Sequence, residues 1–195
     1  MDRNKFWETI DKARAEVLKH SDNMEDIMEV LIEALRGYSD EEIAHWGQIL
    51  VLYKELSYKS IIAAAYYVID DHLSDDGFDY FRGWLITQGK TALLNALRNP
   101  DSILDLNPES EFVWCEGIDY AATCAYTKTT DLEVETFELF DNLCQQYPLP
   151  QEEIAAIKSE IVCFEDKPAY TDREPWEKDK ELLRKKMPNL CERFM

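Results

Sequence analysis

Basic residues are scarce in this chain. Only 21 lysines and arginines stand against 40 aspartates and glutamates in 195 residues, which gives a formal net charge of −19. A surface of this sign repels nucleic-acid phosphates and anionic lipids, so we expect no binding to nucleic acid or to a membrane. A basic protein is the partner that this charge favours, while plain solubility is the ordinary reason for an acidic surface.

Glycine and cysteine are also sparse. The six glycines stand singly, and no GxGxxG or GxxxxGK[ST] phosphate cradle occurs, so no nucleotide cofactor is expected. The five cysteines include no CxxC pair, which is typical of reduced thiols in a cytosol. The longest apolar run, residues 61–69, is too short to span a bilayer, and no signal-peptide core is visible at the start. We therefore expect a cytoplasmic protein.

Histidine, the commonest general base, occurs three times, at His20, His45 and His72. The three are far apart in sequence, and none belongs to a known triad or HExxH motif. A cysteine nucleophile stays open, because Cys and His partners meet in space rather than in sequence. No catalytic residue is assigned, and a non-enzymatic role is favoured.

Helical periodicity is present from end to end. Phe6, Ile10, Ala13 and Val17 recur on one helix face, and hairpin signals are absent. We expect an all-α fold, one compact domain over residues 1–195 with about nine packed helices.

Local signals refine this expectation. A helix containing Ile27 to Leu35 is predicted to end at Gly37, where a left-handed residue is typical. Ser39 and Glu42 match a capping box, which predicts a further helix that runs to about Leu56. Residues 99–111 are predicted to form a loop, and residues 112–126 a helix. Further on, the apolar spacing predicts a helix from Leu132 to Tyr147 with one apolar face, made of Val134, Phe137, Phe140, Leu143 and Cys144.

The segment 74–86 combines acids, aromatics and one arginine. Ser74 suits a helix N-cap, and Asp75 and Asp76 suit the positive end of the helix dipole. The segment resembles the SDDxFxxFRxWLI core of a bacterial family of unknown function, through Ser74, Asp75, Asp76, Phe78, Phe81, Arg82, Trp84, Leu85 and Ile86. The resemblance implies a small bacterial protein with no established catalytic residues. Its members usually have glycines before SDD, where this chain has residues 70–73 (DDHL).

Arg82 admits two interpretations. It can be a buried fork that holds carboxylates, with Asp79 and Arg82 as an i,i+3 pair, and this structural role is favoured. Alternatively, Asp75, Asp76, Arg82 and Trp84 line a cleft that binds a small ligand, as in an enzyme or a ligand sensor.

A cluster of potential metal ligands, five carboxylates and one imidazole, overlaps the start of the same motif. Asp70, Asp71, His72, Asp75, Asp76 and Asp79 fall within ten residues. Carboxylates of this kind suit Ca²⁺, Mg²⁺ or Mn²⁺, but the spacing does not fit an EF-hand. A helix end, a turn and a capped helix start explain the cluster better, so no metal site is predicted.

Acidic helix faces are the last candidate. The residues expected to meet a partner are Glu25, Glu29, Glu33, Asp131, Glu135 and Glu138. A solvated face is the ordinary interpretation of such stripes. The sharper hypothesis is a surface that captures a basic protein, as immunity proteins and some regulators do.

Overall fold

The computed structural model describes residues 1–109, 113–162 and 179–195. Its first half contains α1 (Arg3–Val17), α2 (Met24–Arg36), α3 (Asp40–Leu56), α4 (Ser60–Asp70), α5 (Asp75–Thr87), α6 (Lys90–Arg98) and the 3₁₀ helix η1 (Pro100–Leu106). It continues with α7 (Gly117–Thr127), α8 (Val134–Gln146), α9 (Gln151–Val162), α11 (Lys180–Lys186) and α12 (Pro188–Phe194). No strand occurs in these ranges, so the all-α prediction is confirmed, with twelve helices in place of about nine.

The described chain forms two compact units. The first comprises residues 1–53 and 116–160, and the second comprises residues 54–115 and 161–195. The boundary falls inside α3, between Tyr53 and Lys54, and again near the end of α9. The single-domain prediction stays a prediction.

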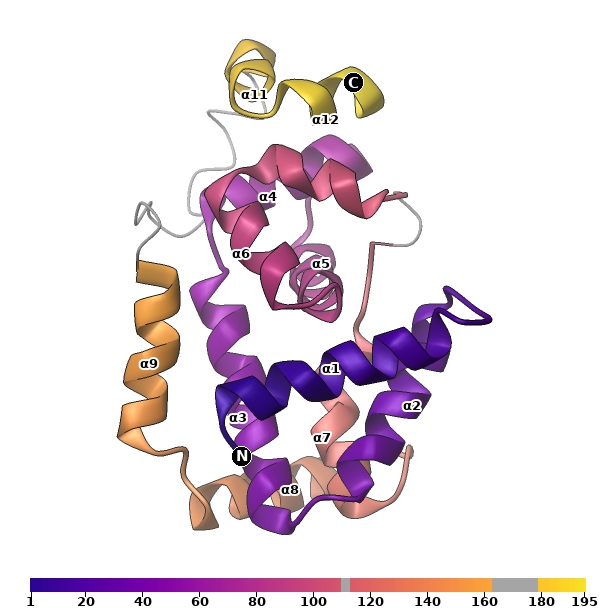
Figure 1. The fold of residues 1–195 in the computed structure, drawn as a ribbon, viewed down its shortest axis with the longest axis vertical. Helices are drawn as coiled ribbons and strands as arrows, with labels where there is room; N and C mark the ends of the chain where they lie inside the picture. The colour runs from indigo at the N-terminus through magenta and orange to yellow at the C-terminus, as the bar shows by residue number, and fades with distance from the viewer. Residues whose placement is uncertain (110–112, 163–178) are drawn as a thin grey trace. The chain divides into compact units, whose positions relative to one another are not determined.

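In the first unit, α2 packs against both α1 and α7, and α7 packs against α8 (Figure 1). Its centre is a cluster of aromatic rings from α1 and α3. The Phe6 ring lies 5.1 Å from Trp46 and 5.7 Å from Tyr53, and Trp7 lies 4.8 Å from Tyr53. Each such pair adds about 0.5–1.5 kcal/mol to the effect of burial alone, so these rings fix α1 on α3.

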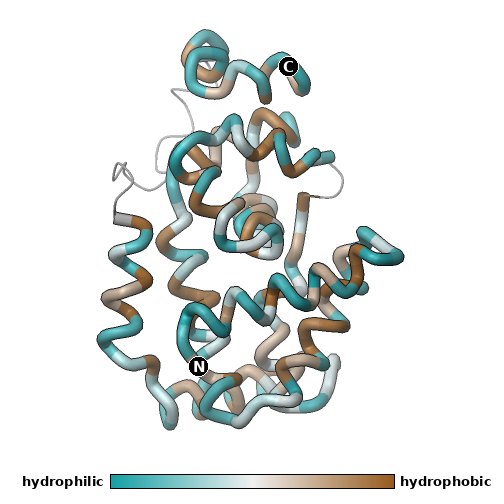
Figure 2. Tube along the Cα trace, viewed as in Figure 1, coloured by the Kyte–Doolittle hydropathy of each residue, from teal (hydrophilic) through white to brown (hydrophobic). Residues whose placement is uncertain are grey.

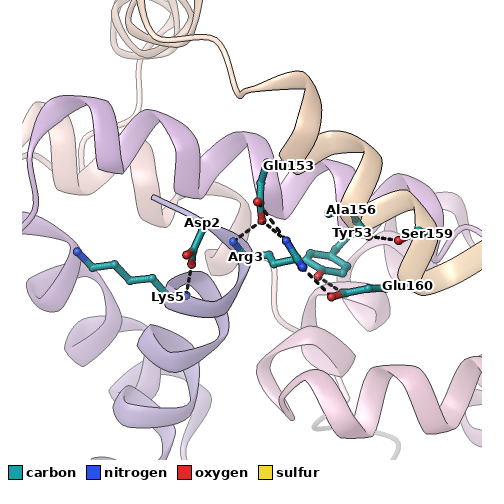
Figure 3. A network of polar contacts seen from close by, with 8 residues as sticks. All are labelled: Asp2, Arg3, Lys5, Tyr53, Glu153, Ala156, Ser159 and Glu160. Carbon is teal, nitrogen blue, oxygen red and sulfur yellow. Dashed lines mark hydrogen bonds and ion pairs between the residues drawn. The ribbon is translucent and has the colours of Figure 1, made fainter.

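Polar contacts join α9 to the same region (Figure 3). Arg3 donates from Nε to Glu160 Oε1 at 2.8 Å and from Nη1 to Glu153 Oε2 at 3.1 Å. The buried Tyr53 hydroxyl donates to Glu160 Oε2 at 2.7 Å. Hydrophilic and hydrophobic residues alternate along α9 (Figure 2), and its Ile157 is fully buried. The buried Ile157 and the carboxylates of Glu153 and Glu160 therefore hold α9 within the first unit.

The second unit is arranged around α4, α5 and α6. Seven of the eleven residues of α4 are buried, including its run of three alanines, and the other four are half-buried, as expected for a helix that is apolar on most sides. η1 packs against α4, α6 and α12. Asp101 of η1 accepts hydrogen bonds from the backbone N–H groups of Asn189 (3.2 Å) and Leu190 (3.1 Å). This carboxylate satisfies donors in the first turn of α12, which its own helix leaves free.

Three local predictions were wrong. Gly37 ends α2 in a right-handed conformation (φ −78°), because the last turn is closed by hydrogen bonds from Gly37 N to Ala34 O (3.2 Å) and from Tyr38 N to Leu35 O (3.0 Å), which need no left-handed residue. Residues 100–106 of the predicted loop form η1, since Pro100 at its first turn has a fixed φ that suits a helix start. The helix predicted over residues 112–126 begins at Gly117 within the described residues, because Cys115 donates its backbone N–H to the Tyr80 carbonyl at 3.0 Å and not to a helical neighbour; Phe112 lies outside the described residues.

Candidate functional site

The motif segment opens α5 as a capped helix. Ser74 is extended and its hydroxyl accepts the Gly77 backbone N–H at 3.0 Å. Asp75 and Asp76 follow in the first turn, where negative charge is favoured, and both side chains are exposed. The predicted cap is confirmed.

Arg82 is buried, with 6% of its surface exposed. Its Nη1 donates to the Lys54 carbonyl oxygen at 2.6 Å, and its Nη2 donates to Asp79 Oδ1. Asp79 Oδ2 also accepts a hydrogen bond from the Lys54 ammonium, Nζ, at 2.6 Å, which forms an ion pair. The guanidinium carbon lies 4.8 Å from the centre of the Tyr58 ring and 5.0 Å from that of Phe78. The predicted Asp79–Arg82 pair is confirmed, and the guanidinium is held by ion pairing, a backbone acceptor and two aromatic faces.

Gly77 lies where the surrounding atoms leave no room for a side chain. A Cβ at this position would lie 2.4 Å from Tyr66 Oη and 2.8 Å from Ser74 Oγ. Tyr66 is 1% exposed, and its hydroxyl donates to Asp70 Oδ2 at 3.0 Å. Burial and the neighbouring Asp70 raise the pKa of Tyr66 to about 12. The tyrosine therefore stays protonated as a hydrogen-bond donor at neutral pH, and it fills the space beside the helix start.

Trp84 closes a stack of rings in the same unit. The Tyr66 and Phe81 rings lie 5.1 Å apart, and Phe81 and Trp84 lie 5.5 Å apart. Trp84 is 5% exposed, so its indole belongs to the core of α5. Such stacking gives the indole a structural role.

The four residues predicted to bind a ligand thus divide into two pairs. Asp75 and Asp76 are exposed in the first turn of α5, whereas Arg82 and Trp84 are buried further along it. The contacts described for Arg82 lead to Asp79 and Lys54. The ligand-binding assignment stays a prediction, and this geometry gives it no added support.

Two residues of the acidic cluster before α5 have roles in the fold. Asp70 accepts the Tyr66 hydroxyl, and burial raises the pKa of its carboxyl group. Asp71 adopts a left-handed conformation (φ 53°) at the end of α4, which aspartate tolerates better than most residues. Within the described residues, no group of three or more His, Cys, Asp or Glu side chains is arranged to hold a metal ion.

The predicted partner-binding acids are all exposed: Glu25, Glu29, Glu33, Asp131, Glu135 and Glu138. The three on α2 follow one another at four-residue intervals, which places them in one stripe. Like charges at this spacing cost about 0.2–0.5 kcal/mol per pair of helix stability. The like-charge pairs within the stripe therefore do not stabilise α2.

The outer surface of α8 was missed by the sequence analysis. The helix predicted over residues 132–147 is confirmed as α8. Of its predicted apolar face, Leu143 is buried and Phe140 and Cys144 are half-buried, whereas Val134 is 70% exposed and Phe137 38%. Leu139, which is not part of that face, is 53% exposed. Phe140 lies beside Tyr126 of α7 and Gly47 of α3, and the start of the apolar face is left uncovered.

An aromatic pair bridges α7 and α8. The rings of Tyr120 and Phe137 meet edge to face at 5.9 Å, and the Tyr120 hydroxyl donates to Glu116 Oε1 at 3.0 Å. The alternation of apolar residues and acids from Val134 to Asp141 was the available signal in the sequence.

The comparisons add a family and no function. The sequence model of the family described as "Protein of unknown function (DUF4240)" matches residues 1–128, which include α1–α7 and the whole α5 motif. Neither the curated proteins nor the solved structures gave a significant match. None of the described helices is long and apolar enough to cross a membrane.

Proposed function

The chain belongs to the family of unknown function whose model it matches, and from its surface we propose that it is a non-enzymatic binding protein that captures a basic protein partner through the acidic faces of α2 and α8. In this proposal it acts in the bacterial cytoplasm, as an immunity protein or a regulator does, with no cofactor. The observation that carries the proposal is the exposure of all six predicted acids.

Electrostatics support this choice of partner. The net charge of −19 attracts a basic protein over distances up to the Debye length, about 8 Å at physiological salt. Complementary charge raises association rates and rejects acidic competitors. Of the residues considered for a ligand cleft, Arg82 and Trp84 are buried, and Arg82 donates to Asp79 and to the Lys54 carbonyl. This favours binding by the surface over catalysis in a cleft.

The test is a pull-down from the cytosol of the native host with tagged protein, at low and high salt, followed by mass spectrometry. The informative variant replaces Glu25, Glu29 and Glu33 with glutamine. We expect the wild type to retain a basic protein at low salt, to release it at high salt, and to lose most of it when the stripe is neutralised.

A matched control removes the same number of charges elsewhere. Asp105, Glu181 and Glu192 are exposed acids of η1, α11 and α12, and their neutralisation should leave capture almost unchanged. Equal losses in both triple variants would show that only net charge matters. Recovery of no basic protein at low salt would contradict the proposal.

A further inference from the structure

A surface patch on α7 and α8 combines one exposed and one half-buried aromatic ring with carboxylates. We name it the aromatic–acidic patch and define it by Tyr120, Val134 and Phe137, with Glu116, Glu138 and Asp141 around them. All six belong to the first unit. None of the six is buried, and Val134 and Phe137 are among the large apolar residues that the described chain leaves exposed.

The contacts make the patch continuous. Glu116 accepts the Tyr120 hydroxyl, and the Tyr120 ring meets Phe137. On α8, Val134 and Phe137 are three residues apart, Val134 and Glu138 four, and Phe137 and Asp141 four, so each pair is adjacent on the helix surface. Aromatic faces and carboxylates are therefore presented together.

The charge of the region identifies the occupant. Residues 116–147 contain seven acids and a single base, Lys128, which ends α7. An arginine side chain matches both parts of the patch. Its guanidinium stacks on aromatic faces and donates paired hydrogen bonds to carboxylates, whereas a lysine ammonium does neither with the same geometry.

We propose that the aromatic–acidic patch is a docking site for an arginine-bearing segment of the basic partner. This inference rests on the proposed function and deepens it, since it assigns the chemistry of the recognised segment and its position on α7 and α8. In the bound state, a guanidinium lies against Tyr120 or Phe137 and pairs with Glu116 or Glu138. Val134 contacts the apolar stem of the arginine or a neighbouring apolar side chain.

The probe is a labelled synthetic peptide of alternating glycine, serine and arginine, compared with the same peptide carrying lysine at every arginine position. Binding to the full chain is followed by fluorescence anisotropy. We expect the arginine peptide to bind about two- to five-fold more tightly than the lysine peptide, the range of one exposed cation–π contact.

Two control variants are matched to the two patch variants. Phe137→Ala and Glu138→Lys alter the patch, whereas Leu139→Ala changes an exposed apolar residue roughly 160° around α8 from Phe137 and Glu192→Lys reverses an exposed acid of α12, outside the acidic faces of α2 and α8. Phe137→Ala should weaken the arginine peptide about two- to five-fold and abolish the preference over lysine. Leu139→Ala should change neither value, and Glu138→Lys should have the larger effect of the two charge reversals. Circular dichroism melts verify that each variant is folded.

The outcomes separate this inference from the proposed function. Equal affinity for the two peptides, or equal effects of patch and control variants, overturns the patch. If the host partner is still captured through the α2 stripe in that case, the proposed function stands alone. Patch-dependent arginine binding with no basic protein captured from the host would support the patch and contradict the proposed function.

Discussion

Replacing Gly77 with alanine should destabilise the second unit, although alanine is the better helix former. Gly77 is the third residue of α5, and Gly→Ala inside a helix ordinarily stabilises by about 1 kcal/mol. Here the new methyl group would lie 2.4 Å from Tyr66 Oη and 2.8 Å from Ser74 Oγ. These atoms must move, because carbon and oxygen do not approach so closely.

The size of the effect follows from how firmly Tyr66 is held. Its ring is buried against Phe81, and its hydroxyl is bonded to Asp70. Overpacking of this kind costs about 1–3 kcal/mol, and a disturbed Ser74 cap adds about 1 kcal/mol. After the gain in helix propensity, Gly77→Ala should lower the free energy of unfolding by about 1–3 kcal/mol.

Urea denaturation followed by circular dichroism measures this change, and Tyr66→Phe supplies the internal control. Phenylalanine at position 66 lacks the hydroxyl oxygen that the new methyl group would meet. Gly77→Ala should therefore lower the free energy of unfolding less in the Tyr66→Phe background than in the wild type. A coupling of at least about 1 kcal/mol is expected in the double-mutant cycle. If the two effects add within about 0.5 kcal/mol, or if Gly77→Ala stabilises the protein, the steric account of this glycine is wrong.

Three further predictions concern charged groups. Glu29→Lys should raise the free energy of unfolding by about 0.5 kcal/mol, since it removes like-charge repulsion with Glu25. It should nevertheless weaken partner capture, and an increase in both stability and capture would contradict the role of the stripe. The pKa of Glu42 is lowered to about 2, first by its hydrogen bond from Lys5, so its contribution to stability is complete above its usual pKa of 4.5 and is lost as pH falls toward 2. Glu42→Gln should therefore flatten the acid limb of a pH–stability profile between about pH 5 and pH 2, and an unchanged limb would refute this assignment. Arg82→Lys should lower the urea-unfolding free energy by about 2 kcal/mol or more, because a lysine does not replace both a buried fork and two ring contacts; a loss below about 0.5 kcal/mol would show that the site is loosely packed.

Features that depend on near neighbours could be predicted from the sequence. The Ser39–Glu42 capping box is present, with the Glu42 carboxylate accepting the Ser39 N–H at 3.1 Å. The Ser74 cap followed from residue type and order alone. Such interactions span three residues of one helix, so the chain order already contains them.

Features that depend on distant segments could not be predicted. The contact of Arg3 with Glu160 joins residues 157 positions apart. The reason for Gly77 lies in Tyr66, on a different helix. The apolar spacing of α8 predicted an apolar face, but how much of that face is covered depends on its packing against α7 and α3. Exposure at Val134 and Phe137, and thus the aromatic–acidic patch, emerges only from tertiary packing.

The central claim is that acidic helix faces capture a basic protein. The most direct measurement is the dissociation constant for the basic protein recovered from the host, as a function of salt, for the wild type and for the variant with Glu25, Glu29 and Glu33 neutralised. Our account predicts an affinity that falls steeply with salt, and a weaker, flatter dependence for the variant. A salt-independent affinity, or one that the variant retains in full, would contradict it.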